Sequence, residues 1–383
     1  MKDNKDLKEL REEIDEIDQR IVELYEHRMR CSEEVAEVKL KQGMNVLDKK
    51  REMEKIAAAE ALTHSEFTRH GVRELFDQIM TMSRMRQYQL LTKSGQKEEP
   101  PFTEVETLFR DDIRVVYQGT EGAYAQMALH AFFGKDRNTY NVYSWRDAMR
   151  EIASGRADYA VLPFENSSAG IVSENYDLLV EYDATIVGEE ILPVEHCLLA
   201  LPEAKFSDIT TVCSHAQALM QCSRFLDKNR QIERLGMANT ALAAKKVKED
   251  GNIHQAAIAS ELTAELYGLQ FLYHGIQNSK SNSTRFLIVS HKKIFVSDAK
   301  KITLCFELPD RGSVVSGSLY HELSHFIFNG LNMNHIESRP IPERNWEYRF
   351  FIDLDGNLKD PAVINALKGL SEETRNLKIL GNY

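Results

Sequence analysis

The sequence lacks three features that define common classes of protein. It has no uninterrupted run of about 18 apolar residues, and its first forty residues are dense in charge. We therefore expect neither a transmembrane helix nor a secretory signal, and a cytoplasmic protein. It also has no long basic run, and its 48 basic and 59 acidic residues give a net charge of −11. This balance argues against nucleic acid and anionic membranes as partners, because both attract clustered Lys and Arg.

Paired cysteines are the third missing feature. The five cysteines are odd in number and form no Cys-x-x-Cys pair, which suits a reducing compartment and supplies no metal framework. The chain has 383 residues, which at roughly 100 to 200 residues per domain allows two to four domains.

Residues 7 to 40 contain neither Gly nor Pro, and their apolar residues recur at alternating steps of three and four. This heptad pattern predicts a helix that ends at Gly43. A helix of about 35 residues is about 50 Å long, which is more than its own domain can cover. Helices exchanged between two chains are therefore expected. Two further helices are predicted over residues 48–62, with Asp48 as the cap, and 67–91.

Three further sequence patterns follow the helical region. A polar stretch with Pro100-Pro101 predicts a linker, short apolar runs that alternate with helical patterns predict an α/β region, and the last region follows the ferredoxin-like order βαββαβ. The predicted segments are residues 1–91 (all α), 92–112 (linker), 113–297 (α/β) and 298–383 (α+β).

Arg28 interrupts the heptad seam, where a charge must be paired. Alone it would equally suit an internal ion pair. Lys39 lies about three turns further along the same stripe, and Ser83 and Gln87 continue the apolar stripe of the third helix. Two cations with neutral donors predict a pocket for a small dianion, and no nucleophile is visible.

These residues resemble the all-helical chorismate mutase domain, over nearly all of residues 7 to 90. The matching residues are Arg11, Arg28, Lys39, Asp48, Arg51, Glu52, Ser83 and Gln87. The resemblance implies a helix-swapped dimer in which Arg28 and a partner-chain Arg11 hold two carboxylates. It implies that Lys39 and Gln87 donate to the ether oxygen, that Asp48 and Glu52 hold the ring hydroxyl, and that Arg51 and Ser83 support them.

Polar residues also follow several predicted strands of the α/β region. They are the turn 118–124 with Thr120, the segment 165–170, the helix start 214–217 with Gln221, and the segment 282–286. Polar groups at the carboxyl ends of strands are typical of ligand sites in α/β folds. Each of these segments alone would suit an ordinary turn.

Together and in this order they resemble prephenate dehydratase, over nearly all of residues 113 to 290. The resemblance implies a two-lobed fold like type II periplasmic binding proteins. Thr284 would assist departure of the ring hydroxyl, with Glu165 as the alternative acid, and Arg285 would support a carboxylate. The other implied pocket residues are Asn166, Ser167 and Gln221. An anion role for Thr120 is the remaining expectation.

The last region contains His321-Glu322-Leu323-Ser324-His325, which fits the zinc-hydrolase pattern H-E-x-x-H. We expect Leu319, Leu323, Phe326 and Ile327 to face inward, which turns both histidines toward solvent and disfavours zinc. The segment instead resembles an ACT regulatory domain. That implies phenylalanine bound between two such domains, at Gly317, Ser318, Leu319, Asn332 and Met333.

As a whole the chain resembles bifunctional chorismate mutase/prephenate dehydratases of phenylalanine biosynthesis. The implied partners are chorismate, prephenate and the effector phenylalanine, in a homo-oligomer that is a dimer or a tetramer. The resemblance also implies that no metal and no cofactor are needed. A lobed protein that only senses a small ligand is the alternative from another class, and a zinc peptidase is the third.

Overall fold

The computed structural model describes residues 6–93, 101–309 and 317–383. Two compact units divide the chain: Met1–Pro100 with Cys305–Lys378, and Pro101–Leu304 with Ile379–Tyr383. Residues 94–100 of the predicted linker lie outside the described residues. No described helix is both long enough and apolar enough to cross a lipid bilayer.

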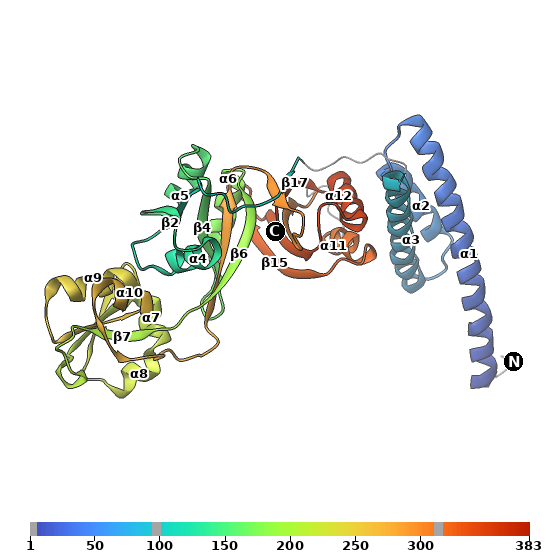
Figure 1. Cartoon of the computed structure of the whole chain (residues 1–383). Coiled ribbons are helices and arrows are strands. Elements are labelled where there is room, and N and C mark those ends of the chain that lie inside the picture. The colour runs from blue at the N-terminus through green and yellow to red at the C-terminus, as the bar shows by residue number, and fades with distance from the viewer. Residues whose placement is uncertain (1–5, 94–100, 310–316) are drawn as a thin grey trace. The chain divides into compact units, whose positions relative to one another are not determined.

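The first unit begins with three helices, α1 (Leu7–Gln42), α2 (Lys49–Ala61) and α3 (Glu66–Lys93), which Figure 1 shows in blue. Asp6 and Glu9 form a capping box that starts α1, and Gly43 ends it in the left-handed conformation, with a φ of 64°. The Asp48 carboxylate accepts a 3.0 Å hydrogen bond from the Arg51 amide at the start of α2. The three predicted helices and their caps are confirmed.

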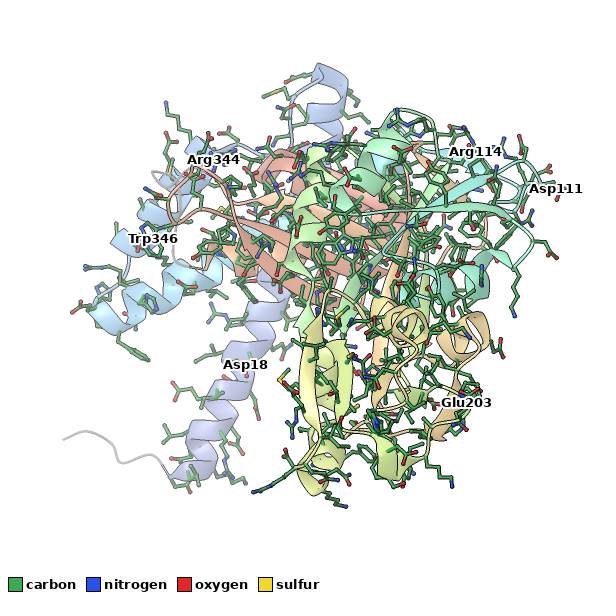
Figure 2. The ribbon with its side chains drawn as sticks, turned by 90° about the vertical axis from the view of Figure 1, so that its left-hand side faces the viewer. Asp18, Asp111, Arg114, Glu203, Arg344 and Trp346 are labelled. Atoms are coloured by element: carbon green, nitrogen blue, oxygen red, sulfur yellow. The ribbon has the colours of Figure 1, made fainter. Side chains whose placement is uncertain are left out.

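The first half of α1 leaves its apolar seam uncovered. Its six seam residues have exposed fractions between 44% and 66%: Leu7, Leu10, Ile14, Ile17, Ile21 and Leu24. Asp18, labelled in Figure 2, lies on the same stretch. A contiguous apolar stripe of this length on a helix is typical of a surface that another chain covers.

The chain from Lys301 onward alternates strands and helices in the predicted order. Its elements are β14 (Lys301–Glu307), α11 (Ser318–Phe328), β15 (Met333–Pro340), β16 (Tyr348–Asp355), α12 (Pro361–Glu373) and β17 (Arg375–Asn382). The strands lie in the order β15-β16-β14-β17. Arg344, in the β15–β16 connection labelled in Figure 2, and Arg349 both donate to the buried carboxylate of Glu307.

The first lobe of the second unit is an α/β layer built on a mixed sheet in the order β6-β12-β4-β2-β3. Its elements are β1 (Thr103–Val105), β2 (Arg114–Gln118), α4 (Tyr124–Phe133), β3 (Asn138–Val142), α5 (Trp145–Ala153), β4 (Tyr159–Asn166), β5 (Gly170–Ile171), α6 (Ser173–Glu181), β6 (Thr185–Pro193), β12 (Ser283–Ser290) and β13 (Ile294–Val296).

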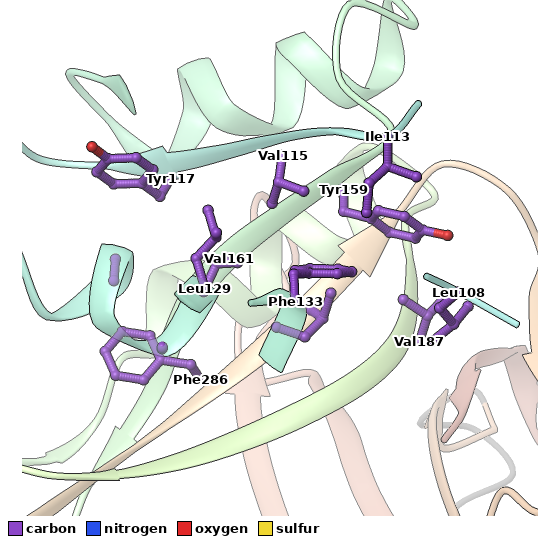
Figure 3. Packing of buried hydrophobic residues seen from close by; sticks show 13 residues of the cluster. Leu108, Ile113, Val115, Tyr117, Leu129, Phe133, Tyr159, Val161, Val187 and Phe286 are labelled. Atoms are coloured by element: carbon purple, nitrogen blue, oxygen red, sulfur yellow. The ribbon is translucent and has the colours of Figure 1, made fainter. Parts of the chain in front are cut away.

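The core of this lobe lies between α4 and the sheet. Figure 3 shows Val115, Val161 and Phe286 of three neighbouring strands meeting Leu129 and Phe133 of α4. Leu108, within the predicted linker, is also buried in this cluster. Because β1 pairs with β13 as well, the residues from 101 onward pack as part of this lobe.

The second lobe has its own sheet, in the order β11-β7-β10-β8-β9. Its elements are β7 (Cys197–Ala200), η1 (Phe206–Asp208), β8 (Thr211–His215), α7 (Ala216–Gln221), α8 (Ser223–Lys228), β9 (Glu233–Met237), α9 (Thr240–Asp250), β10 (Gln255–Ala259), α10 (Glu261–Tyr267) and β11 (Gln270–Tyr273). The chain passes between the lobes twice, after β6 and after β11. The predicted two-lobed α/β architecture is confirmed.

Candidate active sites

The helices α1, α2 and α3 line a cavity of about 430 Å³. Seven of the eight residues predicted from the helical pattern border it: Arg28, Lys39, Asp48, Arg51, Glu52, Ser83 and Gln87. The eighth, Arg11, is exposed on the uncovered half of α1. One chain therefore brings together every predicted residue except the one expected from a partner.

Neutral groups hold the two seam cations of this cavity. The Arg28 guanidinium donates a 2.6 Å hydrogen bond to Ser83 Oγ, and Lys39 Nζ donates to the carbonyl of Val46. Burial lowers the pKa of Arg28, against the opposing effects of Tyr25 and Glu52. Among the described residues, no carboxylate forms a hydrogen bond or an ion pair with either cation, so the cavity offers positive charge to an anionic ligand.

Arg84 borders the same cavity and was missed by the sequence reasoning. Its Nη1 donates to Glu52 Oε2 over 2.5 Å, and its Nε donates to Glu373 Oε1 over 2.9 Å. Burial opposes the charge of Arg84, but Glu373 and Glu52 outweigh it and raise the pKa of the guanidinium. The only sequence signal was a second polar residue directly after Ser83 on a buried stretch of α3.

In the second unit, Thr284 on β12 lies opposite Asn166 on β4. Asn166 Nδ2 donates a 2.9 Å hydrogen bond to Thr284 Oγ1 and a 3.0 Å hydrogen bond to Asn282 Oδ1. Asn166 Oδ1 in turn accepts from the Ser168 amide over 3.0 Å. The hydroxyl of Thr284 is thus held by a side chain that is itself fixed on both ends.

Residues of the second lobe extend this network. Gln221 Nε2 donates to Ser168 Oγ over 2.6 Å, and Gln221 Oε1 lies 2.9 Å from His196 Nε2. His196 Nδ1 lies 3.2 Å from the Tyr124 hydroxyl. Burial lowers the pKa of His196, against a smaller effect of its bond to Gln221, which favours the neutral imidazole. Sequence reasoning found Gln221 but missed His196, which is an isolated histidine in no motif.

Glu165 and Arg285 are also direct neighbours across β4 and β12. Successive side chains of a strand point to opposite faces, so this pair lies on the face away from Thr284 and Asn166. Arg285 donates to Glu189 over 2.8 Å and to the Tyr383 hydroxyl over 2.8 Å. The structure therefore separates these two predicted residues from the Thr284 hydroxyl.

The remaining predicted residues of this region lie at its margins. Ser167 is exposed and accepts from the Ser283 amide over 2.9 Å. Thr120 Oγ1 lies 3.4 Å from Asn239 Oδ1 of the second lobe. In the same turn, a Cβ on Gly122 would lie 2.7 Å from Thr263 Cγ2, so only glycine lets the turn approach the second lobe this closely.

The comparisons with known proteins match this division of the chain. Residues 10–88 match the family model for chorismate mutase type II, and residues 115–294 match that for prephenate dehydratase. A bifunctional chorismate mutase/prephenate dehydratase of Pseudomonas aeruginosa is 32% identical over 100% of this chain and 99% of its own. The chain belongs to the bifunctional chorismate mutase/prephenate dehydratase family.

Solved structures are similar to 70% and 71% of this chain. A prephenate dehydratase from Arthrobacter aurescens in complex with L-Phe has a TM-score of 0.65 and 29% identity, and covers 71% of this chain and 90% of its own. A structure described as a quorum-quenching acylase, GqqA, has a TM-score of 0.64 and 30% identity over 70% of this chain and 96% of its own.

The residues predicted to bind an effector follow the dehydratase domain. Gly317, with a φ of 86°, precedes Ser318 and Leu319 at the start of α11. Asn332 and Met333 lie beyond the other end of α11, where Asn332 Nδ2 donates to Asp355 Oδ2 over 2.9 Å. The 11 residues of α11 span about 16 Å. One ligand cannot bridge both segments within one chain.

The predicted orientation of α11 is wrong for His325 and Ile327, although Phe326 is buried as expected. His325 is fully buried and Glu322 nearly so, whereas Ile327 is 56% exposed. Both histidines were expected to face solvent, but α11 packs its Glu322 and His325 side against α12 and α3. A Cβ on Gly369 of α12 would lie 2.2 Å from the His325 ring, so the glycine makes room for the imidazole.

This inward side also places Glu322, His325 and Glu373 close together, with one ligand atom of each within 4.8 Å of the others. The Arg84 guanidinium binds both oxygens of Glu373, over 2.9 Å and 3.1 Å. Both oxygens of the Glu373 carboxylate, which a metal ion would need as a ligand, are thus already bound to Arg84. His321, the first histidine of the pattern, lies apart and pairs with Asp77 over 3.0 Å.

Glu322 generates a prediction about stability and pH. Burial and the neighbouring Glu373 raise the pKa of Glu322 to about 8, against Arg84 and Lys49, while an unfolded glutamate titrates near pH 4.3. The folded protein thus keeps a proton that the unfolded chain releases. The contribution of this group is full below about pH 4 and is lost as the pH rises toward 8, at about 1.4 kcal/mol per pKa unit.

We expect Glu322→Gln to remove this loss. Between pH 5.5 and 8 the thermal unfolding midpoint of the wild type should fall more than that of the variant. Glu373 does not change its charge between pH 5.5 and 8, because His325 and Arg84 outweigh its burial and lower its pKa to about 2. Glu74→Gln, at an exposed position of α3, is the control. Parallel pH curves for wild type and Glu322→Gln would contradict the assignment.

Proposed function

We propose that the helical cavity binds chorismate and that its residues have the roles implied by the family. Arg28 holds a carboxylate, Lys39 and Gln87 donate to the ether oxygen, and Glu52 with Asp48 holds the ring hydroxyl, while Arg51 and Ser83 support this set. The observation that carries the proposal is the gathering of seven predicted residues from three helices around one cavity.

The rearrangement of chorismate to prephenate suits such a cavity. A Claisen rearrangement is unimolecular and needs no acid, base or covalent step. It requires that the reactive compact conformer is held and that donors point at the oxygen where negative charge develops. Fixed cations and amides supply both requirements.

The cavity is complete only in a dimer in this proposal. Arg11 lies on the exposed apolar half of α1, far along the helix from Arg28. Burying this seam against a second chain would cover six large apolar side chains, each worth about 1.5 to 3 kcal/mol when fully buried. The same exchange would deliver Arg11 of one chain to the cavity of the other.

Thr284 is the residue on which we place the dehydratase reaction, the loss of carbon dioxide and water from prephenate to give phenylpyruvate. Its Oγ1 accepts from Asn166, which leaves its own hydrogen available for the departing ring hydroxyl. A threonine hydroxyl is a weak acid, so it donates a hydrogen bond rather than an early full proton. Glu165, on the other face of the sheet, is the less suitable donor.

The C-terminal region is proposed to be an ACT domain with a ferredoxin-like fold. Its element order and its strand order support this assignment. Phenylalanine would bind where Gly317 to Leu319 of one copy meet Asn332 and Met333 of another, because these segments lie at opposite ends of α11. A relative with bound L-Phe supports phenylalanine as the ligand.

One measurement tests the whole proposal, namely turnover of chorismate and of prephenate with and without phenylalanine. Phenylpyruvate is followed by its ultraviolet absorbance. A protein that binds prephenate without forming phenylpyruvate would be the sensing protein of the alternative class. Metal analysis of the purified protein tests the zinc peptidase, which requires one bound zinc ion per chain.

Lys39→Ala should abolish chorismate turnover and leave prephenate turnover nearly intact. Its Nζ lines the mutase cavity, and the dehydratase network lies in the other unit. Lys41→Ala, an exposed lysine at the end of the same helix, is the matched control for charge. If a folded Lys39→Ala lost both activities equally, the two sites would not be separate.

Thr284→Ala should reduce phenylpyruvate formation by roughly 100- to 1000-fold, the typical cost of removing one donor to a developing oxyanion. Chorismate turnover should not change. Thr284→Ser keeps the hydroxyl and should retain most of the activity. Wild-type rates in Thr284→Ala would remove Thr284 from the mechanism and make Glu165→Gln the next variant to measure.

Phenylalanine should inhibit the dehydratase without competing with prephenate. A coupling of about 1 to 3 kcal/mol between the sites corresponds to a shift of roughly 5- to 150-fold. Leu319→Ala should weaken the inhibition, and Ile327→Ala, exposed on the same helix, should not. If phenylalanine competes with prephenate and inhibits Leu319→Ala as strongly as the wild type, it binds in the catalytic cleft.

Point variants are preferable to deletion of residues 298–383 in this test. The Tyr383 hydroxyl accepts a hydrogen bond from Arg285, and Lys301 Nζ donates to Glu189. Deletion would therefore remove contacts of the dehydratase itself.

A further inference from the structure

Two neighbouring carboxylates at the end of α12, Glu372 and Glu373, reach the helical domain. All of these residues belong to the first unit. Glu373 accepts two hydrogen bonds from the Arg84 guanidinium, over 2.9 Å and 3.1 Å. Glu372 Oε2 accepts from the Tyr88 hydroxyl over 2.8 Å and from the Leu47 amide over 3.4 Å. None of these contacts involves a residue that the resemblance assigned to catalysis.

Glu373 is connected to the mutase cavity through Arg84. The Nη1 atom of Arg84 donates to Glu52 Oε2 over 2.5 Å, and both Arg84 and Glu52 line the cavity. A planar guanidinium that binds one carboxylate with two nitrogens has a fixed orientation. Glu373 therefore determines the direction from which Arg84 meets Glu52.

Glu372 is connected to the other side of the cavity through the loop before α2. It accepts from the amide of Leu47, and the carbonyl of the preceding residue, Val46, accepts from Lys39 Nζ. Each carboxylate of α12 is thus connected to one cavity residue. Glu373 is connected to Glu52, which is proposed to hold the ring hydroxyl, and Glu372 to Lys39, which is proposed to donate to the ether oxygen.

The burial of the pair makes this support strong. The side chains of Arg84 and Glu373 are only 7% and 9% exposed. Removing one member of a buried ion pair leaves the other charge without its partner, which favours a rearrangement of the remaining groups. With Glu373 neutralised, Glu52 would be the remaining carboxylate bound to Arg84 among the described residues, and we expect the guanidinium and the Glu52 carboxylate to shift together.

We infer that Glu373 is a positioning residue for the mutase reaction, and that it acts through Arg84 on Glu52. Glu372 is the second positioning residue and acts through residues 46 and 47 on Lys39. The C-terminal domain therefore completes the mutase site of the same chain. This inference rests on the proposed mutase function of the cavity.

The test uses the full-length protein and measures kcat and KM for chorismate and for prephenate. Glu373→Gln should lower kcat/KM for chorismate by roughly 10- to 100-fold, the scale expected when a catalytic group is displaced by about 1 Å. Turnover of prephenate should equal that of the wild type. Glu372→Gln should lower chorismate turnover as well, and it decides the question if Glu373→Gln does not fold.

Asp77→Asn is the matched control. Asp77 pairs with His321 where α3 meets α11, but it does not line the cavity. It should leave chorismate turnover unchanged. If it lowers turnover as much as Glu373→Gln, any loosening between these helices is sufficient, and the specific role of Glu373 is refuted.

A double variant separates positioning from a purely structural role. If Glu373 acts only through Glu52, then Glu52→Gln with Glu373→Gln should be no worse than Glu52→Gln alone. Losses that multiply overturn the inference, as do wild-type kinetics in folded Glu373→Gln and Glu372→Gln. A wild-type protein that does not convert chorismate would instead refute the proposed function.

Discussion

Arg84 shares one guanidinium between Glu52 of α2 and Glu373 of α12, and the arrangement of the first unit depends on that pairing. A cation withdrawn from water is tolerated only where carboxylates are already in place. The same requirement explains why α11 turns Glu322 and His325 inward. Once Arg84 and Glu373 occupy the contact between α3, α11 and α12, polar neighbours are compatible with it. The apolar Ile327 is then exposed, while Phe326 remains buried.

The two sites place charge in opposite ways. In the helical cavity Arg28 and Lys39 are held by neutral oxygens, so their charge remains available to a dianion. In the dehydratase domain the charged pair Arg285 and Glu189 lies away from Thr284, whose own surroundings are amides and hydroxyls. The first arrangement favours holding an anionic conformer, and the second favours donation to a neutral leaving group.

Local patterns were sufficient to predict most of the fold and much of the cavity. The heptad spacing with its caps predicted α1 to α3, and the interruption of an apolar seam by Arg28 identified the cavity, because both depend on residues close in sequence. Arg84 with Glu373 could not be found in this way, since the partners are 289 positions apart. The prediction that His325 of α11 faces solvent failed for the same reason, because its surroundings are set by α12, which is distant in sequence.

The contact between α3 and α12 also bears on why the two activities share one chain. A separate mutase domain would keep only Glu52 as a carboxylate partner of Arg84 and would leave the other side of the guanidinium exposed to water. Here the compensating carboxylate comes from the region proposed to bind the pathway's end product. A ligand that shifts α12 would therefore change the position of Glu52 through two hydrogen-bonded contacts, from Glu373 to Arg84 and from Arg84 to Glu52.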